Sequence, residues 1–196
     1  MITFNVEIKG TSPLLINRFT EEAQAEKKTR RIEVAENPDP RKEATRKAYI
    51  AEDGSYYFSA FSIPNCMGAA GSSYKQKGSR KTLRFVVPSA IRMDTDTITI
   101  LDDDGVSNHF EVDSRPVTIP ATKGRIMRHR PRWNIWKARF RLLVNEDLLD
   151  PITAHRLLAD AGQTIGIGDF RPEKRGPFGC FIVTEWMEQK VLKEAA

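Results

Sequence analysis

A loop rich in glycine and basic residues carries the clearest candidate chemistry in this chain. Four glycines and two prolines surround three basic residues between Gly166 and Gly179. Glycine has no Cβ, so it permits positive φ and lets another backbone approach closely. Basic side chains on such a loop suit a phosphate backbone, although an ordinary helix-to-strand connection with solvated charges is the alternative. The loop residues expected to contact nucleic acid are Gly166, Gly168, Arg171, Lys174 and Arg175.

A second basic stretch extends from Ser114 to Asn145 and contains no acidic residue. Trp133 and Trp136 interrupt its arginines and lysines. Single-stranded nucleic acid is bound by this mixture, because cations attract phosphates and aromatic rings stack on bases. The alternative is a basic surface with both tryptophans in the core, and binding is the interpretation we favour. The candidate contacts in this stretch are Arg125, Arg128, His129, Arg130, Arg132 and Trp133.

Two further groups of cations complete the predicted interface. Residues 136–144 alternate as a half-buried strand, which places Lys137, Arg139 and Arg141 together on its polar face. Aligned like charges are costly unless they are solvated or paired with an anion, so these three are expected to face the ligand. A predicted helix over residues 64–76 is followed by a basic loop, which adds Lys75, Lys77, Arg80 and Lys81.

The sequence offers little for catalysis or metal binding. Residues 102–104 are three aspartates, but the fuller ligand pattern of a calcium loop is missing. No nucleotide-binding P-loop, zinc-ligand spacing or serine triad is present. Cys66 and Cys180 lie far apart and are expected to be reduced thiols. We therefore predict no catalytic residue, no metal and no cofactor.

Length and charge set the broad class. A chain of 196 residues with 40% hydrophobic content is expected to form a single domain. Its formal net charge of +5 favours an anionic partner. Residues 1–9 alternate and lack the apolar block of a signal peptide, and no run reaches the length of a membrane span. A cytoplasmic protein without membrane contact is the expectation.

The predicted elements define a fold. Strands are expected at residues 2–9, 83–88, 90–93, 97–101, 110–112, 116–119, 136–144 and 178–186. A hairpin with a type I′ turn at Asp53-Gly54 is expected over residues 49–58, and a helix over 151–161 is expected to end at Gly162. Without its insertions, the order is strand, helix, strand, strand, helix, strand. This order predicts an α+β, ferredoxin-like fold with one sheet face free for a ligand, and with insertions at about 17–60 and 90–130.

Three segments resemble one known family. They are residues 10–15 after the first strand, residues 63–70 in a helix begun by proline, and the loop from Gly166 to Gly179. Together they resemble the RAMP superfamily (repeat-associated mysterious proteins), and most closely the backbone subunits of CRISPR effector complexes. The resemblance covers both ends of the core but not the insertions, and the chain is short for a backbone subunit. The glycine-rich loop is its most specific part.

The resemblance implies a modified RNA-recognition fold over residues 1–196 and a role in antiviral defence. It implies guide RNA, with or without a target strand, bound through sugar-phosphate contacts, and head-to-tail assembly with copies of itself and other effector subunits. An inserted hairpin acts in the family as a thumb that interrupts the guide–target duplex, and residues 90–130 are the candidate for it here. RNA and single-stranded DNA both remain open as ligands, because phosphate contacts do not separate them.

Two alternatives stay open beside the scaffold. The family's guide-processing endoribonucleases share the glycine-rich loop and use a histidine near the first helix as general acid or base. This chain has only His109, His129 and His155, none of which precedes that helix, and Asp39 is the single aspartate between the first strand and the Asp53 turn. A structural or single-strand-binding protein of a phage or mobile element is the second alternative.

Overall fold

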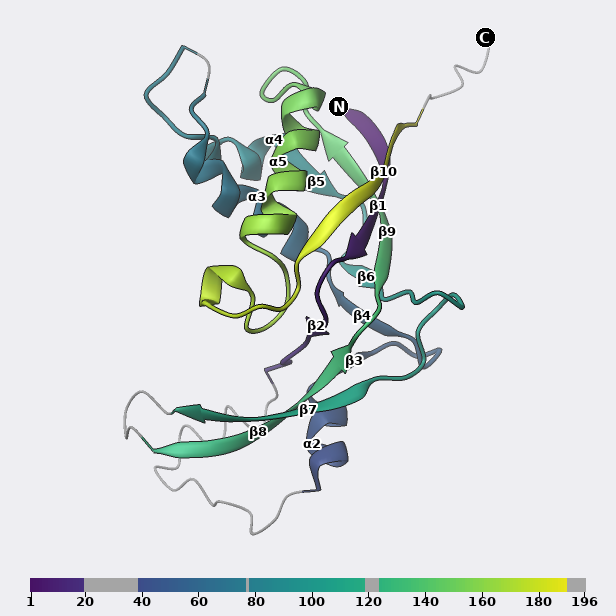
Figure 1. The fold of residues 1–196 in the computed structure, drawn as a ribbon. Helices are drawn as coiled ribbons and strands as arrows, with labels where there is room; N and C mark the ends of the chain where they lie inside the picture. The colour runs from purple at the N-terminus through teal and green to yellow at the C-terminus, as the bar shows by residue number, and fades with distance from the viewer. Residues whose placement is uncertain (20–38, 77, 119–123, 190–196) are drawn as a thin grey trace.

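A four-stranded antiparallel sheet with the strand order β10-β1-β9-β5 lies at the centre of the fold (Figure 1). The computed structural model describes residues 1–19, 39–76, 78–118 and 124–189. The architecture is mixed α and β with antiparallel sheets, which confirms the predicted α+β class. The strands of the central sheet are β1 (Ile2–Gly10), β5 (Ile91–Met93), β9 (Lys137–Val144) and β10 (Phe181–Glu188).

The core lies between this sheet and the helices on one side of it (Figure 1). Alternate residues of β1 and β9, such as Val6 and Leu142, are buried, as their period-two pattern predicts. Each fully buried aliphatic side chain contributes about 1.5–3 kcal/mol. The helices that cover this face are α3 (Ser62–Ala70), α4 (Val87–Ala90) and α5 (Pro151–Thr164).

Helix α5 begins where the sequence predicts and ends later. Asp150 is its N-cap, with a carboxylate that accepts a hydrogen bond from the Thr153 N–H at 2.9 Å. The prediction that Gly162 ends the helix is wrong. Gly162 lies inside α5, where a Cβ would collide with the backbone oxygen of Phe181. The glycine therefore allows α5 to pack closely on β10.

The segment after α3 differs most from its prediction. The predicted strand over residues 83–88 is a 3-10 turn, η2 (Leu83–Phe85), followed by α4. Its buried residues Leu83, Val87 and Ala90 are three to four positions apart, which is the helical spacing that packs against α3. α3 is also shorter than predicted, because the chain passes at Gly71 into a second 3-10 turn, η1 (Gly71–Ser73).

The first predicted hairpin is present, but its turn is of another type. The Gly54 N–H donates to the carbonyl of Ala51 at 3.0 Å, and Gly54 has φ +84° while Asp53 has no positive φ. A type I′ turn needs positive φ at both central residues, so this is a type I turn closed by a left-handed glycine. The sheet it belongs to consists of β3 (Tyr49–Ile50), β4 (Tyr56–Ser59) and β6 (Thr97–Thr99).

A long hairpin extends away from the central sheet (Figure 1). The predicted short strands at 110–112 and 116–119 belong to a single strand, β7, which pairs with β8. A helix, α2, packs against both strands and is capped by Asp39. Residues 20–38, Lys77, residues 119–123 and residues 190–196 lie outside the described part of the chain. The elements of this region are β2 (Leu14–Leu15), α2 (Pro40–Arg46), β7 (Glu111–Thr118) and β8 (Arg125–Trp133).

The lengths and composition of the helices show whether any of them could span a membrane. Among the described residues, none of the helices is both long enough and apolar enough to span a bilayer.

Candidate nucleic-acid interface

A polar groove of about 560 Å³ lies between the glycine-rich loop and the first turn of α3. It is lined on one side by the loop that joins α5 to β10 and on the other by β4, α3 and the segment after β2. Its polar groups are amides, hydroxyls, two carboxylates and one guanidinium, which suit a ligand rich in hydrogen-bonding atoms. The lining residues are Ile16, Asn17, Tyr49, Phe58, Ser59, Ser62, Asn65, Cys66, Gly166, Ile167, Gly168, Asp169, Arg171 and Glu173.

The glycine-rich loop is held by backbone contacts that require glycine. At Gly168, φ is +77°, and a Cβ would collide with the backbone oxygen of Leu15 on β2. At Gly176, a Cβ would collide with the carbonyl of Phe170 on the opposite side of the loop. The Asp169 N–H donates to the Leu15 oxygen at 2.8 Å, so the loop is attached to β2. Close backbone approach, which the glycines predicted, therefore occurs within the protein itself.

The basic residues of this loop divide into two groups. Arg171 lines the groove, but its Nη1 donates to the Gly168 carbonyl at 2.9 Å and its Nη2 contacts the Glu173 carboxylate. Lys174 and Arg175 are exposed, and Arg175 has φ +61°. Arg171 therefore shapes the loop, while the other two cations extend into solvent.

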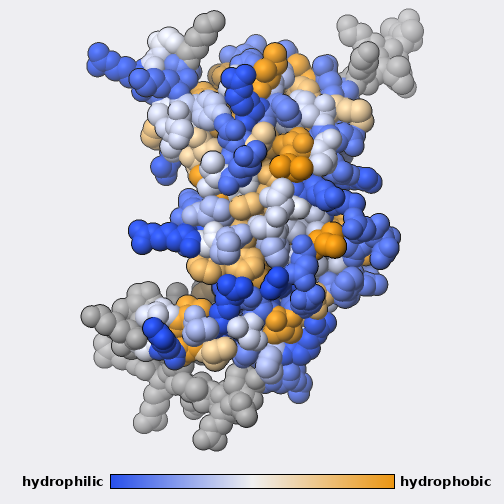
Figure 2. Space-filling model, in the orientation of Figure 1, coloured by the Kyte–Doolittle hydropathy of each residue, from blue (hydrophilic) through white to orange (hydrophobic). Residues whose placement is uncertain are grey.

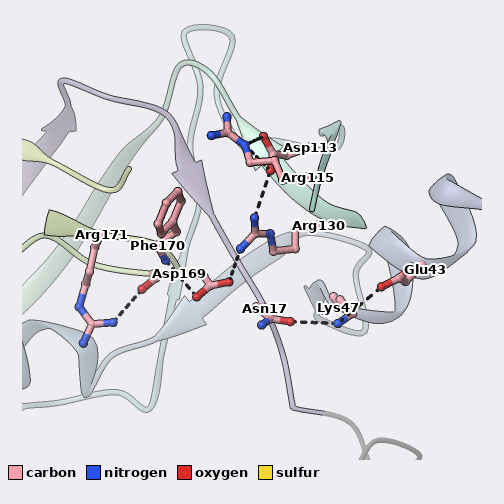
Figure 3. A network of polar contacts seen from close by, with 10 residues as sticks. Asn17, Glu43, Lys47, Asp113, Arg115, Arg130, Asp169, Phe170 and Arg171 are labelled. Atoms are coloured by element: carbon pink, nitrogen blue, oxygen red, sulfur yellow. Dashed lines mark hydrogen bonds and ion pairs between the residues drawn. The ribbon is translucent and has the colours of Figure 1, made fainter. Parts of the chain in front are cut away.

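An ion bridge joins the loop to the long hairpin (Figure 3). Arg130, on β8, donates from Nη1 to Asp169 Oδ2 at 2.8 Å and from Nη2 to Asp113 Oδ2 at 3.3 Å. Arg115 also contacts Asp113, from Nε to both carboxylate oxygens. Arg130 is only 6% exposed, which argues against the predicted direct contact with nucleic acid. Its charge is used to connect β7 and β8 with the loop.

Phe178 provides a second contact between loop and hairpin. Its ring is buried, with the guanidinium carbon of Arg115 at 4.6 Å and that of Arg132 at 6.0 Å from the ring centroid. Cations over an aromatic face stabilise this packing. Arg132 was predicted to bind nucleic acid, and the structure directs its guanidinium to the loop. The Nε atoms of Arg130 and Arg132 are buried without a hydrogen-bond partner among the described residues.

The structure adds a residue that the sequence did not indicate, Lys47. Its Nζ donates to Asn17 Oδ1 at 3.2 Å and lies 3.7 Å from Glu43 Oε1 (Figure 3). Arg128 lies 3.8 Å from the same carboxylate oxygen. Burial lowers the pKa of Lys47, and the charge of nearby Arg128 lowers it further. An anion beside Lys47 would relieve this repulsion.

The predicted cations of the central sheet are present but already paired. Arg139 and Arg141 are exposed on the face of β9 opposite to the core, as the alternation predicts. Each of the three nevertheless contacts a carboxylate of the protein: Lys137 contacts Asp103 at 2.7 Å, Arg139 contacts Glu7 at 2.6 Å, and Arg141 contacts Asp94. The hydrogen bond from Arg139 lowers the pKa of Glu7. An external anion is therefore not needed to compensate these charges. The expectation that these three cations face the ligand depended on that need, so the structure removes the reason for placing the ligand on this face of β9.

Two predicted contacts on β8 lie in the interior. Trp133 is 3% exposed and packs edge-on against Tyr56 at 5.4 Å, so it cannot stack on a base. His129 is also buried, with Nδ1 at 2.7 Å from Ser114 Oγ on β7. Burial therefore argues against direct contact of either side chain with nucleic acid, because Trp133 belongs to the hydrophobic core and His129 contacts Ser114 of the neighbouring strand.

The basic loop after α3 is separate from the groove. Lys75, Arg80 and Lys81 are exposed where the chain continues from η1 to η2, beyond the C-terminal end of α3. The groove is at the opposite end of that helix, around Ser62 and Asn65. The structure therefore does not bring these cations together with the glycine-rich loop, and Lys77 lies outside the described residues.

The hairpin strands carry a large excess of positive charge. β7 and β8 contain five arginines and two acidic residues. Arg115 lies directly opposite Arg128 in the strand register, which is unfavourable for like charges. Arg125 and Arg128 keep exposed side-chain area, 41% in the case of Arg128. The surface seen in Figure 2 is largely hydrophilic, and its hydrophobic residues form small separate patches.

The residues considered for catalysis have structural roles or lie apart from the groove. The carboxylate of Asp39 accepts hydrogen bonds from the first turn of α2. The ring of His155 packs on Trp186 with 5.1 Å between centroids, and His109 lies on an exposed loop, 4.0 Å from Asp102. Within the described ranges, the structure brings together no group of three side chains that could bind a metal ion.

Comparison with known proteins adds no assignment. The chain matches no protein-family model, and no curated protein sequence matches it. The functional argument therefore depends on the residues and their geometry.

Proposed function

We propose that this chain is an RNA-binding scaffold subunit of the RAMP type, which coats a guide RNA through sugar-phosphate contacts. In this proposal it assembles head-to-tail with copies of itself and other subunits in a CRISPR-type ribonucleoprotein of the cytoplasm. The RNA would follow the groove beside the glycine-rich loop and the exposed arginines of the β7–β8 hairpin. The proposal thus moves the ligand from the open sheet face to the hairpin side of the molecule.

The topology supports a ferredoxin-like fold of the modified RNA-recognition type. In the order of the chain, the four strands of the central sheet are β1, β5, β9 and β10. The sheet order β10-β1-β9-β5 therefore places the fourth strand beside the first, and the third strand between the first and the second. Helix α3 connects β1 to β5 along the chain, and α5 connects β9 to β10. Both features are those of a split βαβ arrangement. The elements between β1 and α3, and those between β5 and β9, would then be its two insertions.

The observation that carries the proposal is the charge excess of the hairpin beside the groove. Five arginines against two acidic residues leave three positive charges in excess on β7 and β8. Two carboxylates from outside the hairpin, Asp169 beside Arg130 and Glu43 beside Arg128, reduce this local excess to one positive charge. Arg130 contacts Asp169 and Lys47 contacts Asn17, and both of these partners line the groove. A phosphate chain is the ligand that such a surplus attracts, and the attraction is independent of base sequence.

Binding rather than cleavage is supported by the positions of the histidines. His129 is buried against Ser114, and neither His109 nor His155 lines the groove. A general acid or base has to reach the scissile phosphate or its 2′-hydroxyl. The endoribonuclease alternative predicts that labelled RNA is cut by the purified protein and that the cutting is lost in His129→Ala. The scaffold proposal predicts intact RNA with both proteins.

The binding site can be tested by the salt dependence of affinity. Fluorescence anisotropy with labelled RNA and DNA 20-mers of mixed sequence gives log Kd as a function of log salt concentration. For single strands, each phosphate contact contributes about 0.7 to the slope. The double variant Arg125→Gln/Arg128→Gln is therefore expected to reduce the slope by about 1.4. Comparison of the RNA and DNA strands decides which of them is the preferred ligand.

A matched control is available on the central sheet. Arg139→Gln/Arg141→Gln removes the same charge from two exposed arginines of β9, away from the proposed path of the RNA, and its slope is expected to equal that of the wild type. A reduced slope in this control alone would return the ligand to the sheet face. Absence of RNA binding by the wild type would refute the function itself and favour a phage or mobile-element structural protein. Co-purified RNA in a large species with a repeating protein stoichiometry, measured by absorbance ratio and gel filtration, would support assembly on RNA.

A further inference from the structure

We infer that Arg130, on strand β8 of the hairpin, is a positioning residue that holds the glycine-rich loop in place at the groove. In this role it acts on the ligand only through Asp169 and the loop backbone. The effect on RNA affinity depends on the proposed function, whereas the effect on the loop does not.

The first evidence is the geometry of the bridge. Arg130 is buried and places one guanidinium between two carboxylates, Asp113 on β7 and Asp169 on the loop (Figure 3). The planar guanidinium suits two partners at fixed angles, which a lysine cannot satisfy in the same way. Arg115 gives Asp113 a second cation, so the set of two arginines and two aspartates is neutral. The charge of Arg130 is therefore compensated by carboxylates of the protein itself.

The second evidence is the strained backbone that Asp169 supports. Phe170, the next residue, has φ +49°, a left-handed conformation that is uncommon for an aromatic residue. Asp169 Oδ1 accepts a hydrogen bond from the Phe170 N–H at 3.0 Å, while Oδ2 accepts from Arg130. Strained residues persist where the surrounding contacts determine them strongly. The same aspartate is thus bound by both oxygens and, through its N–H, by Leu15.

The consequence concerns the wall of the groove. Gly166, Ile167, Gly168, Asp169 and Arg171 form one side of it. Loss of the bridge leaves Asp169 without its cation and removes a charge-assisted hydrogen bond, which is among the stronger kinds in proteins. Fewer contacts then hold Phe170 in its left-handed backbone conformation. We expect the loop to open more often while the core of the domain stays folded.

Hydrogen exchange of the full chain without RNA tests this directly. In Arg130→Met and in Asp169→Asn, the loop amides of Ile167, Asp169 and Phe178 are expected to exchange about 10- to 100-fold faster than in the wild type. The amides of β1 are expected to keep their rates. Asp169→Asn is isosteric, but Phe170 and Arg130 donate to different oxygens of the carboxylate, and in asparagine one of these two positions becomes an NH2 group that cannot accept. Arg139→Met removes a paired arginine that is exposed and does not contact the loop; it is the control for loss of an ion pair elsewhere and is expected to change no loop amide.

Each outcome decides the inference. Unchanged loop exchange in Arg130→Met refutes it, and if that variant does not fold, unchanged exchange in Asp169→Asn refutes it equally. RNA binding supplies a second measurement, in which Arg130→Met is expected to weaken affinity with the salt slope unchanged. A slope reduced by about 0.7 would make Arg130 a direct phosphate contact and overturn the positioning role. If the wild type binds no RNA, the proposed function fails while the exchange rates still test the bridge.

Discussion

Replacement of Gly168 by alanine tests whether backbone contact between the glycine-rich loop and β2 holds this region together. Gly168 has φ +77°, and a Cβ there would collide with the Leu15 backbone oxygen and approach Leu14 Cδ1. An alanine in the left-handed region costs about 1–2 kcal/mol. Forcing an extra methyl group into packed surroundings adds about 1–3 kcal/mol. The loop has to move away from β2 to relieve the collision, which would also alter the groove.

Gly54 provides a matched control, because it isolates the cost of the backbone conformation. Its φ is +84° in the exposed β3–β4 turn, and a Cβ there would have no atom within 4 Å. Gly54→Ala is therefore expected to lower the free energy of unfolding by the conformational cost alone, about 1–2 kcal/mol. Gly168→Ala is expected to lose clearly more, measured for both by urea unfolding followed by circular dichroism. Equal losses in the two variants would refute the close packing of the loop on β2.

Two further predictions follow from the pKa values and need only the purified protein. The pKa of Glu7 is lowered mainly by its hydrogen bond from Arg139, so this pair stabilises the fold above the usual glutamate pKa and loses its effect as the pH falls through the lowered value. Because Arg139 is exposed, Glu7→Gln is expected to cost at most about 1 kcal/mol near pH 7 in urea unfolding, and a loss that stays constant down to about pH 2 would contradict the pairing. Burial raises the pKa of the Cys66 thiol to about 12, so Ellman's reagent at pH 8 is expected to modify only Cys180 rapidly in the native protein. Rapid modification of both thiols before denaturant is added would show that Cys66 is not buried as described.

Strictly periodic segments were the predictable part of the fold. The alternation of residues 2–9 and 136–144 correctly predicted β1 and β9, because one face of each strand is buried. Asp150-Pro151 correctly marked the start of α5, since a capping carboxylate and a proline act locally. Gly162 was misread, because its contact with Phe181 on β10 is not visible in the local sequence. β8 was missed as a strand because arginines, not apolar residues, occupy its alternate positions.

The candidate site was only partly predictable, because its charges are compensated over long sequence distances. Arg130 contacts Asp113 and Asp169, which are 17 and 39 residues away. The carboxylates that pair with Lys137, Arg139 and Arg141 come from β1 and from loops between other strands. The three cations are recognisable in the local sequence, but their partners are identified only in the folded structure. Lys47 was overlooked within a segment of mixed charge. The glycine-rich loop itself was identified from composition, because the close backbone contacts at Gly168 and Gly176 require glycine locally.

The position of the bound strand is the central claim, and photo-crosslinking measures it most directly. RNA 20-mers carrying 4-thiouridine, irradiated with the full chain and mapped by mass spectrometry, would report which residues lie beside the bases and sugars. We predict crosslinks in the loop of residues 166–179 and in the β7–β8 hairpin, with few in β9. Crosslinks concentrated on β9 around Arg139 and Arg141, with none in the loop or the hairpin, would contradict the proposed site.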